Sequence, residues 1–302
     1  MKKKLAVTCW LLLMATALFS QPANSQTAPI QQAPGDVFRV KVRLVEVYAA
    51  VFDHSGRYID GLTRDSFDVR EDGQAQNIAN FEASTVRLSC GILLDTTGSM
   101  AAVLPRVKNA VLKLIDALGP DDAVAIYSFD RQVTLRQDFT TDKAAAKRAV
   151  LRLRAEGETA LFDSIAQTSQ EIAQQAGKKA LVIFTDGDDN SSTINANAAI
   201  NRAKKLGLPL YTIAEGEALQ SRPLKKTLAE LSESTGGLPF EARKSGDIEQ
   251  IFQEISHDLR HLYLISYKPP PGVEPGKWRK IDVAVRGQGD YRIRSKQGYS
   301  VE

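Results

Sequence analysis

The sequence predicts an α/β protein in which a doubly wound, mainly parallel sheet is inserted between two β segments that form a small sandwich. In the central region, continuous apolar runs such as Leu88 to Leu94 alternate with stretches of helical spacing. That alternation is typical of strands buried on both faces by helices. In residues 37–84 and 262–302 only β signals occur. Neither flank has enough strands to close a core alone, so we expect the two flanks to pack together.

The first flank is expected to hold three strands, at residues 38–52, 66–70 and 77–81. The first of them, FRVKVRLVEVYAAVF, alternates and is rich in valine, which predicts one long strand. The turn signals DHSG and EDG separate the three runs.

The central region alternates strands and helices in a regular order. We expect strands at 88–94, 123–129, 133–139, 180–184 and 210–214, and helices at 101–118, 143–153, 160–175, 196–206, 224–232 and 248–259. The last flank then gives strands at 262–267, 278–285 and 291–295, with PPPG and GQG as turns.

The N-terminal stretch has the pattern of an export signal. Three lysines precede an apolar run from Leu5 to Phe19 that is short for a membrane span, and small residues follow. We expect cleavage after Ser25, which makes the protein secreted or periplasmic. An uncleaved anchor is the alternative, and in either case membrane contact is limited to this segment. The expected organisation is a signal peptide at 1–25, a flexible tether at 26–36, β segments at 37–84 and 262–302, and the α/β domain at 85–261.

The composition excludes several classes of protein. A net charge of +3, from 39 basic and 36 acidic side chains, gives no reason to expect nucleic acid as a partner. No glycine-rich phosphate loop follows a strand, so nucleotide binding is not expected either. Only Cys90 remains after the expected cleavage, and its apolar surroundings indicate a small buried side chain rather than a disulfide partner.

Polar side chains follow the predicted parallel strands at the edge where such sheets bind ligands. Asp95, Thr97 and Ser99 come directly after the first buried strand, and Asp186 comes after the strand at 180–184. Thr159 lies in a loop between them, and Gly98 is expected to let the first loop curl. Carboxylates and hydroxyls without thiolate or imidazole favour a hard cation such as Mg²⁺, Mn²⁺ or Ca²⁺.

The pattern DxTxS, followed by Thr159 and then by Asp186 and Gly187, resembles the metal-ion-dependent adhesion site of von Willebrand factor A (vWA) domains. The flanks are similar to those of a bacterial, exported subgroup. The resemblance implies that Thr97 and Ser99 bind Mg²⁺ or Mn²⁺ directly. Thr159 would be a direct or water-mediated ligand, and Asp95 and Asp186 would act mainly through waters. A protein partner would supply an Asp or Glu to the open coordination position. Threonine stands at the first hydroxyl position, where serine is commonest in the family. The sequence MAA follows in place of the acidic residues that a second, adjacent metal site requires.

Other interpretations of these motifs remain open. The DTTGS loop could be a helix cap and TDG an ordinary turn. The run at 188–190 is expected to be a solvated loop, although it could hold calcium. His257 and His261 share a helix face, but the intervening sequence lacks the glutamate of a zinc protease. No nucleophile–histidine pair or Gly-x-Ser-x-Gly turn is present, so an enzyme is not expected. The alternative function is a metal-independent structural or assembly protein that binds through its β flanks.

Overall fold

The structure is a computed structural model that describes residues 44–83, 86–244, 246–271, 276–287 and 289–300. The expected signal peptide, the tether and the start of the first strand lie outside these residues. All described residues belong to one compact unit, Val42–Glu302. Among them, no helix is long and apolar enough to cross a membrane.

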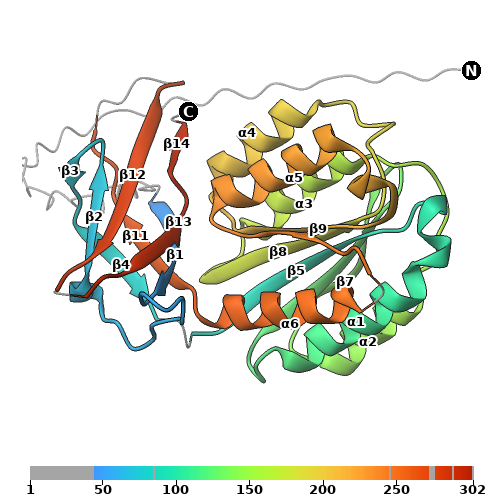
Figure 1. Cartoon of the computed structure of the whole chain (residues 1–302), viewed down its shortest axis with the longest axis horizontal. Helices are drawn as coiled ribbons and strands as arrows, with labels where there is room; N and C mark the ends of the chain where they lie inside the picture. The colour runs from blue at the N-terminus through green and yellow to red at the C-terminus, as the bar shows by residue number, and fades with distance from the viewer. Residues whose placement is uncertain (1–43, 84–85, 245, 272–275, 288, 301–302) are drawn as a thin grey trace, which may run out of the picture. The chain divides into compact units, whose positions relative to one another are not determined.

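The centre of the fold is a six-stranded sheet with the strand order β10-β9-β8-β5-β6-β7 (Figure 1). Five strands are parallel, and β7 runs antiparallel to β6 as an edge strand. The apolar runs form these strands because both faces of the sheet are covered, which removes their side chains from water. The strands are β5 (Leu88–Asp95), β6 (Ala123–Phe129), β7 (Val133–Thr140), β8 (Lys178–Thr185), β9 (Leu210–Ala214) and β10 (Pro239–Glu241).

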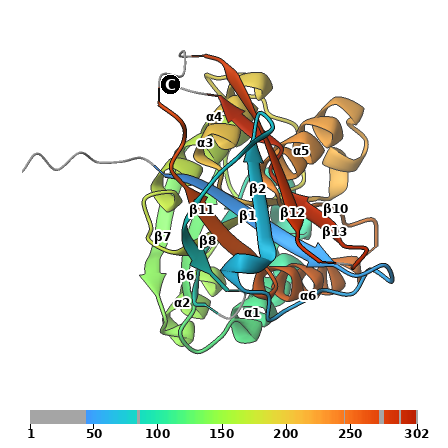
Figure 2. The ribbon, with the colours of Figure 1, turned by 90° about the vertical axis from the view of Figure 1, so that its left-hand side faces the viewer.

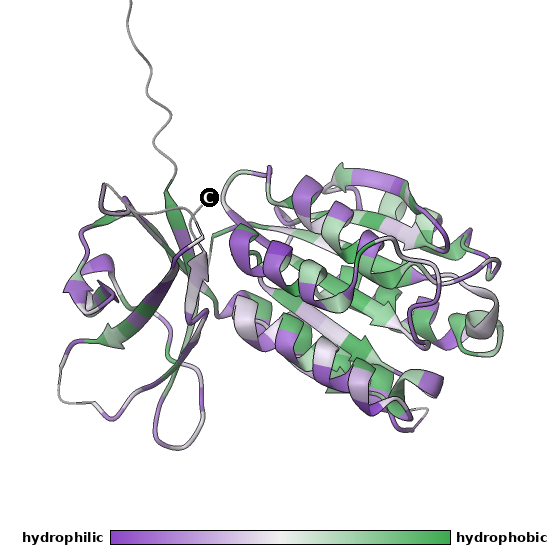
Figure 3. Ribbon diagram, turned by 90° about the horizontal axis from the view of Figure 1, so that it is seen from above, coloured by the Kyte–Doolittle hydropathy of each residue, from purple (hydrophilic) through white to green (hydrophobic). Residues whose placement is uncertain are grey.

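Helices cover both faces of this sheet, and alternate residues of β5 show the division. Ile92 and Leu94 pack in one core with α1, α2 and α6, whereas Leu93 packs in a second core with α3, α4 and α5. Figure 3 shows hydrophobic residues concentrated along the strands and hydrophilic ones on the helices. The helices are α1 (Leu104–Ala117), α2 (Lys143–Leu151), α3 (Leu161–Ile172), α4 (Ala196–Leu206), α5 (Arg222–Thr235) and α6 (Asp247–Arg260).

The two flanks form a sandwich of two antiparallel sheets, as expected, with strand orders β13-β1-β11-β4 and β14-β12-β2-β3 (Figure 2). Each sheet takes strands from both flanks, and their facing side chains share one core. The strands are β1 (Val45–Phe52), β2 (Phe67–Glu71), β3 (Gln74–Ala75), β4 (Ile78–Glu82), β11 (Tyr263–Tyr267), β12 (Trp278–Val285), β13 (Arg292–Ser295) and β14 (Gly298–Ser300).

Strand β1 joins the sandwich to the α/β region, because it is buried on both faces. Val47 and Val51 face the sandwich core, whereas Tyr48 and Phe52 pack into the core that contains α1 and α6. The Tyr48 hydroxyl also accepts a hydrogen bond of 3.0 Å from the backbone N–H of Lys179, at the start of β8. This double burial explains why the sequence of the strand is apolar at nearly every position.

Three short strands, β3, β10 and β14, were not predicted from the sequence. Each has two or three residues and lies at the edge of its sheet, which is too short for a period-two pattern to appear. Strand β10 completes the central sheet at one end, and Phe240 pairs with Ile213 of β9 there.

Candidate functional site

Two loops meet at the carboxyl edge of the central sheet, one after β5 and one after β8. Asp95 is the last residue of β5, and Thr97 precedes a 3₁₀ helix, η2 (Gly98–Ala102). Asp186 directly follows β8, which is the neighbour of β5 in the sheet. Adjacent parallel strands therefore bring the two predicted carboxylates to the same edge.

Asp95 is completely buried and organises the first loop. One of its carboxylate oxygens accepts a hydrogen bond of 2.9 Å from the backbone N–H of Thr97. The other accepts one of 2.8 Å from the hydroxyl of Thr185, the last residue of β8. The carboxylate thus ties the two strand ends together.

The hydroxyl groups lie between the two carboxylates. Thr97 Oγ1 and Ser99 Oγ share a hydrogen bond of 3.0 Å, and Ser99 Oγ donates one of 2.8 Å to Asp186 Oδ1. Thr159 lies beside them, since a Cβ built on Gly187 would lie 3.9 Å from Ser99 Oγ and 4.0 Å from Thr159 Oγ1. The structure therefore brings all five predicted residues together, and we call this group the edge cluster. Ser99 is its exposed member and opens it to solvent.

The loop that carries Thr159 is fixed by backbone contacts to the first loop. Glu156 N donates to the carbonyl oxygen of Thr96 at 2.7 Å, and Gly98 N donates to that of Gly157 at 3.3 Å. Gly157 has φ +94°, and a Cβ there would come within 2.9 Å of Asp130. The expectation that Gly98 provides the curl is wrong, because Gly98 does not adopt a positive φ. Gly157 is the glycine whose missing side chain this edge requires.

The acidic run at 188–190 is not simply a solvated loop, which corrects the expectation. Asn190 Oδ1 accepts a hydrogen bond of 3.0 Å from Thr159 N, and Asp189 Oδ2 accepts one of 2.9 Å from Phe162 N. Asp189 and Asn190 therefore hold the start of α3, and with it Thr159, against the loop after β8. Asp188 remains exposed.

The edge cluster holds more negative charge than its own contacts neutralise. Burial raises the pKa of Asp186 to about 6; the hydrogen bond from Ser99 opposes the shift, and the charges of Asp95 and Glu215 add to it. Burial also raises the pKa of Asp95. The sequence analysis missed Glu215, which follows β9 at the same sheet edge. It is buried and pairs with Arg106 at 2.9 Å through Oε1, while Oε2 has no hydrogen-bond partner.

These residues fit a hard divalent cation. The donor set consists of oxygen atoms only, and a cation would relieve the repulsion between buried carboxylates. The described residues contain no group of three or more His, Cys, Asp or Glu side chains placed to hold a metal. A cation at the edge cluster would therefore depend on the hydroxyls of Thr97, Ser99 and Thr159 together with the two aspartates.

His257 and His261, at the end of α6, lie near the starts of β5 and β8, at the edge of the sheet opposite the edge cluster. His261 Nδ1 is 2.7 Å from Asp60 Oδ2, and the His261 ring stacks on Tyr58 with 4.6 Å between ring centroids. His257 meets the Tyr58 ring in an edge contact and the His261 ring at a tilt, with 5.0 and 4.5 Å between ring centroids. These contacts give the histidines a packing role between α6 and the first flank.

Comparison with known proteins identifies the family. The model of the von Willebrand factor type A domain matches residues 91–254. An uncharacterised protein of Synechocystis, sll0103, is 28% identical over 225 residues, which is 67% of this chain and 51% of that protein, so the chain spans about half the length of this relative.

Two solved structures are similar in fold. A von Willebrand factor type A protein from Catenulispora acidiphila has a TM-score of 0.52 and 15% identity, with 86% of this chain and 75% of that chain covered. Proximal thread matrix protein 1 from the mussel byssus has a TM-score of 0.50 and 18% identity, covering 62% of this chain and 49% of the other. The family match spans more than half of the sequence and the α/β sheet agrees with it, so this chain belongs to the von Willebrand factor type A domain family.

Proposed function

We propose that the protein is a metal-dependent binding module, in which the edge cluster holds a divalent cation that coordinates a carboxylate of a protein partner. A vWA domain is a protein-interaction module. The proposal of a metal site is supported by the hydrogen-bonded chain from Asp95 through Thr97 and Ser99 to Asp186. It places hydroxyls between two buried carboxylates and opens to solvent at one side.

Mg²⁺ and Mn²⁺ suit this cluster because both prefer oxygen ligands in a compact octahedron. The protein would contribute hydroxyls and carboxylates, and a partner's Asp or Glu would complete the coordination. We propose that the protein acts by binding and is not an enzyme. We also propose that the segment at 1–25 directs export, and that residues 37–84 and 262–302 form a β domain around the vWA domain at 85–261. Sequencing of the mature N-terminus tests the export step.

Calorimetric titration of the purified protein with Mn²⁺ tests the metal site. We expect one-site binding that Asp186→Asn abolishes. Asp188→Asn is the matched control, because it makes the same change at an exposed position in the same loop. Thermal unfolding of both variants shows whether they remain folded.

Two results would count against the proposal. Folded wild-type protein that binds no Mn²⁺, with or without a carboxylate-bearing peptide, would exclude the metal site. Equal loss in the two variants would assign the effect to the general charge of the loop. In the first case, partner binding through the β flanks becomes the better hypothesis.

A further inference from the structure

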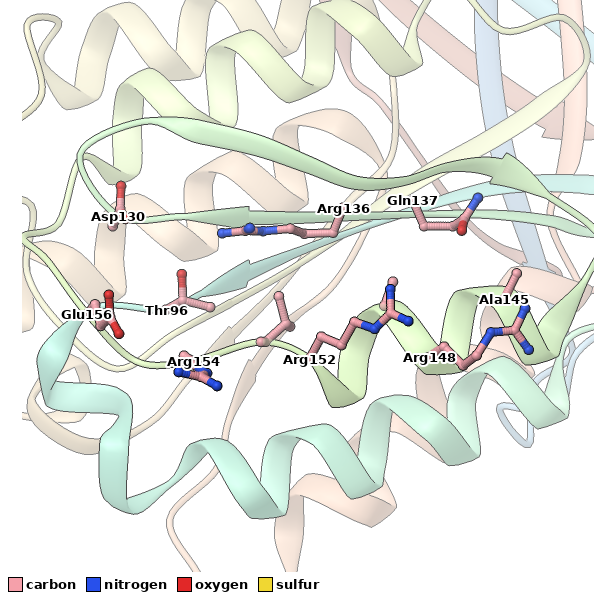
Figure 4. Close-up of a pocket in the computed structure, with 11 residues that line it drawn as sticks. Thr96, Asp130, Arg136, Gln137, Ala145, Arg148, Arg152, Arg154 and Glu156 are labelled. Atoms are coloured by element: carbon pink, nitrogen blue, oxygen red, sulfur yellow. The ribbon is translucent and has the colours of Figure 1, made fainter.

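A groove between β7 and α2 carries a concentration of positive charge that the metal site does not use. Figure 4 shows Arg136 on β7 and Arg148 on α2 lining it, with Arg152 and Arg154 just beyond the end of the helix. Its volume of about 510 Å³ leaves room for several side chains of a ligand. All four arginines are exposed at the surface.

These arginines are largely without acidic partners. Arg148 lies 3.8 Å from Asp142, and both side chains are mostly exposed. Arg136 donates to the neutral hydroxyl of Ser128 at 2.8 Å. In the part of the chain that the structure describes, Arg152 and Arg154 form no ion pair. Asp130 and Glu156 also line the groove, at the end where Thr96 lies, and the four guanidinium groups leave it with a net positive charge. Such a surface attracts anions, and arginine binds carboxylates with two parallel hydrogen bonds.

A lysine that contacts the backbone at the end of α2 adds positive charge close to Arg154. Lys108 of α1 donates to the carbonyl oxygens of Leu151 and Leu153, at 3.0 and 2.6 Å. Burial, with the charge of Arg154 added to it, lowers the pKa of Lys108. The lysine and Arg154 therefore repel each other, and an anion in the groove would reduce that repulsion.

The groove ends beside the loop after β5, which carries part of the edge cluster. Thr96, which lines it, lies between Asp95 and Thr97 and accepts the 2.7 Å hydrogen bond from Glu156 N. In Figure 4, Thr96 and Glu156 lie at one end of the groove and Arg148 lies toward the other. A chain bound at the cluster can therefore continue along the arginines without leaving the surface.

Apolar side chains near the groove favour a polypeptide as its occupant. Ala145, Ala149 and Leu153 contribute apolar surface to the lining of the groove. Protein interfaces combine such apolar contacts with arginine, whereas a small anion or a polysaccharide makes little use of them.

We propose that this groove binds an acidic peptide segment, whose Asp or Glu side chains pair with Arg136, Arg152 and Arg154 while the segment extends from the edge cluster. The inference rests on the proposed function in one respect: we take the acidic segment to belong to the same partner whose carboxylate binds the metal. The arginine contacts themselves do not require the metal.

Two labelled peptides of equal length provide the probe. One has aspartate at alternate positions in a glycine–serine background, and the other has a single aspartate in the same background. In Mn²⁺ buffer we expect the aspartate-rich peptide to bind more tightly. The double substitution Arg136→Gln and Arg152→Gln should weaken it by about fivefold or more and leave the single-aspartate peptide unchanged. The matched control is Arg202→Gln with Arg222→Gln, which removes the same charge from exposed positions on α4 and α5.

Binding measured with and without a chelator distinguishes failure of the groove proposal from failure of the metal-site proposal. With a chelator, the aspartate-rich peptide should keep an affinity that still depends on the groove arginines, even if the metal proposal fails. Equal affinity for the two peptides, or equal loss in the groove and control variants, would overturn the inference. So would arginine-dependent binding of dextran sulfate that is tighter than that of a peptide of equal charge, because it would assign the groove to a polysaccharide.

Discussion

Replacement of Arg294 by leucine should strongly destabilise the junction between α6 and the β sandwich. Asp258, on α6, is completely buried. Its carboxylate accepts hydrogen bonds from the hydroxyls of Tyr58 at 2.5 Å and Tyr211 at 2.6 Å, and two from Arg294 of β13, at 2.7 and 2.6 Å. These contacts join α6 to β9, to β13 and to the loop after β1.

The expected magnitude follows from what the substitution leaves behind. Arg294→Leu removes the guanidinium that pairs with Asp258 and leaves a buried carboxylate with only two neutral donors. Breaking a buried ion pair costs about 3–5 kcal/mol. We expect about 3 kcal/mol, at the lower end, because the tyrosine hydroxyls remain and the Arg294 side chain is 20% exposed.

Urea unfolding at neutral pH measures the free energy of unfolding directly. Arg292→Leu is the matched control, because it makes the same change at an exposed arginine on the same strand, where a cation–π contact with Phe52 at 5.0 Å is worth about 0.5–1 kcal/mol. Adding Asp258→Leu to Arg294→Leu should recover part of the loss, since no uncompensated charge then remains. Equal losses for Arg294→Leu and Arg292→Leu would refute this reasoning.

Three further predictions concern separate parts of the fold. Burial lowers the pKa of Lys296 to about 8, so above that pH the unfolded chain binds more protons than the folded one. Lys296 should therefore contribute about 2 kcal/mol to a rise in the free energy of unfolding between about pH 8 and 9.5, and Lys296→Met should reduce the slope by that amount; equal slopes would contradict this. A Cβ on Gly91 of β5 would lie 2.0 Å from Ile172 Cδ1. Gly91→Ala should cost about 1–3 kcal/mol in urea unfolding, and Ile172→Val, which removes that methyl group, should recover part of it; simple additivity would exclude the clash. Glu215→Gln should weaken Mn²⁺ binding about fivefold in calorimetry by removing charge beside the edge cluster, whereas the exposed Glu217→Gln should not; equal affinities of the wild type and Glu215→Gln would rule out an electrostatic role.

The sequence by itself determined the α/β architecture and the composition of the edge cluster. The apolar runs of β5, β8 and β9 are short, are bounded by polar loops and alternate with helical patterns, which is typical of strands covered on both faces. Residues that directly follow such strands must lie at one edge of the sheet. Asp95 and Asp186 could therefore be placed together without knowledge of any contact between them.

Only the tertiary structure decided the contacts that depend on long-range packing. Glu215 follows the short strand β9 with no motif around it, and its place beside Asp186 depends on the strand order. The pairing of Asp258 with Arg294 joins a helix to a strand of the β sandwich, and neither position carries a local pattern that indicates the other. The groove arginines come from β7, from α2 and from the residues just after α2, and they share a surface because β7 turns back antiparallel to β6. Local sequence indicates which residues are buried and where strands end. Which side chains far apart along the chain contact each other depends on how the helices and strands pack.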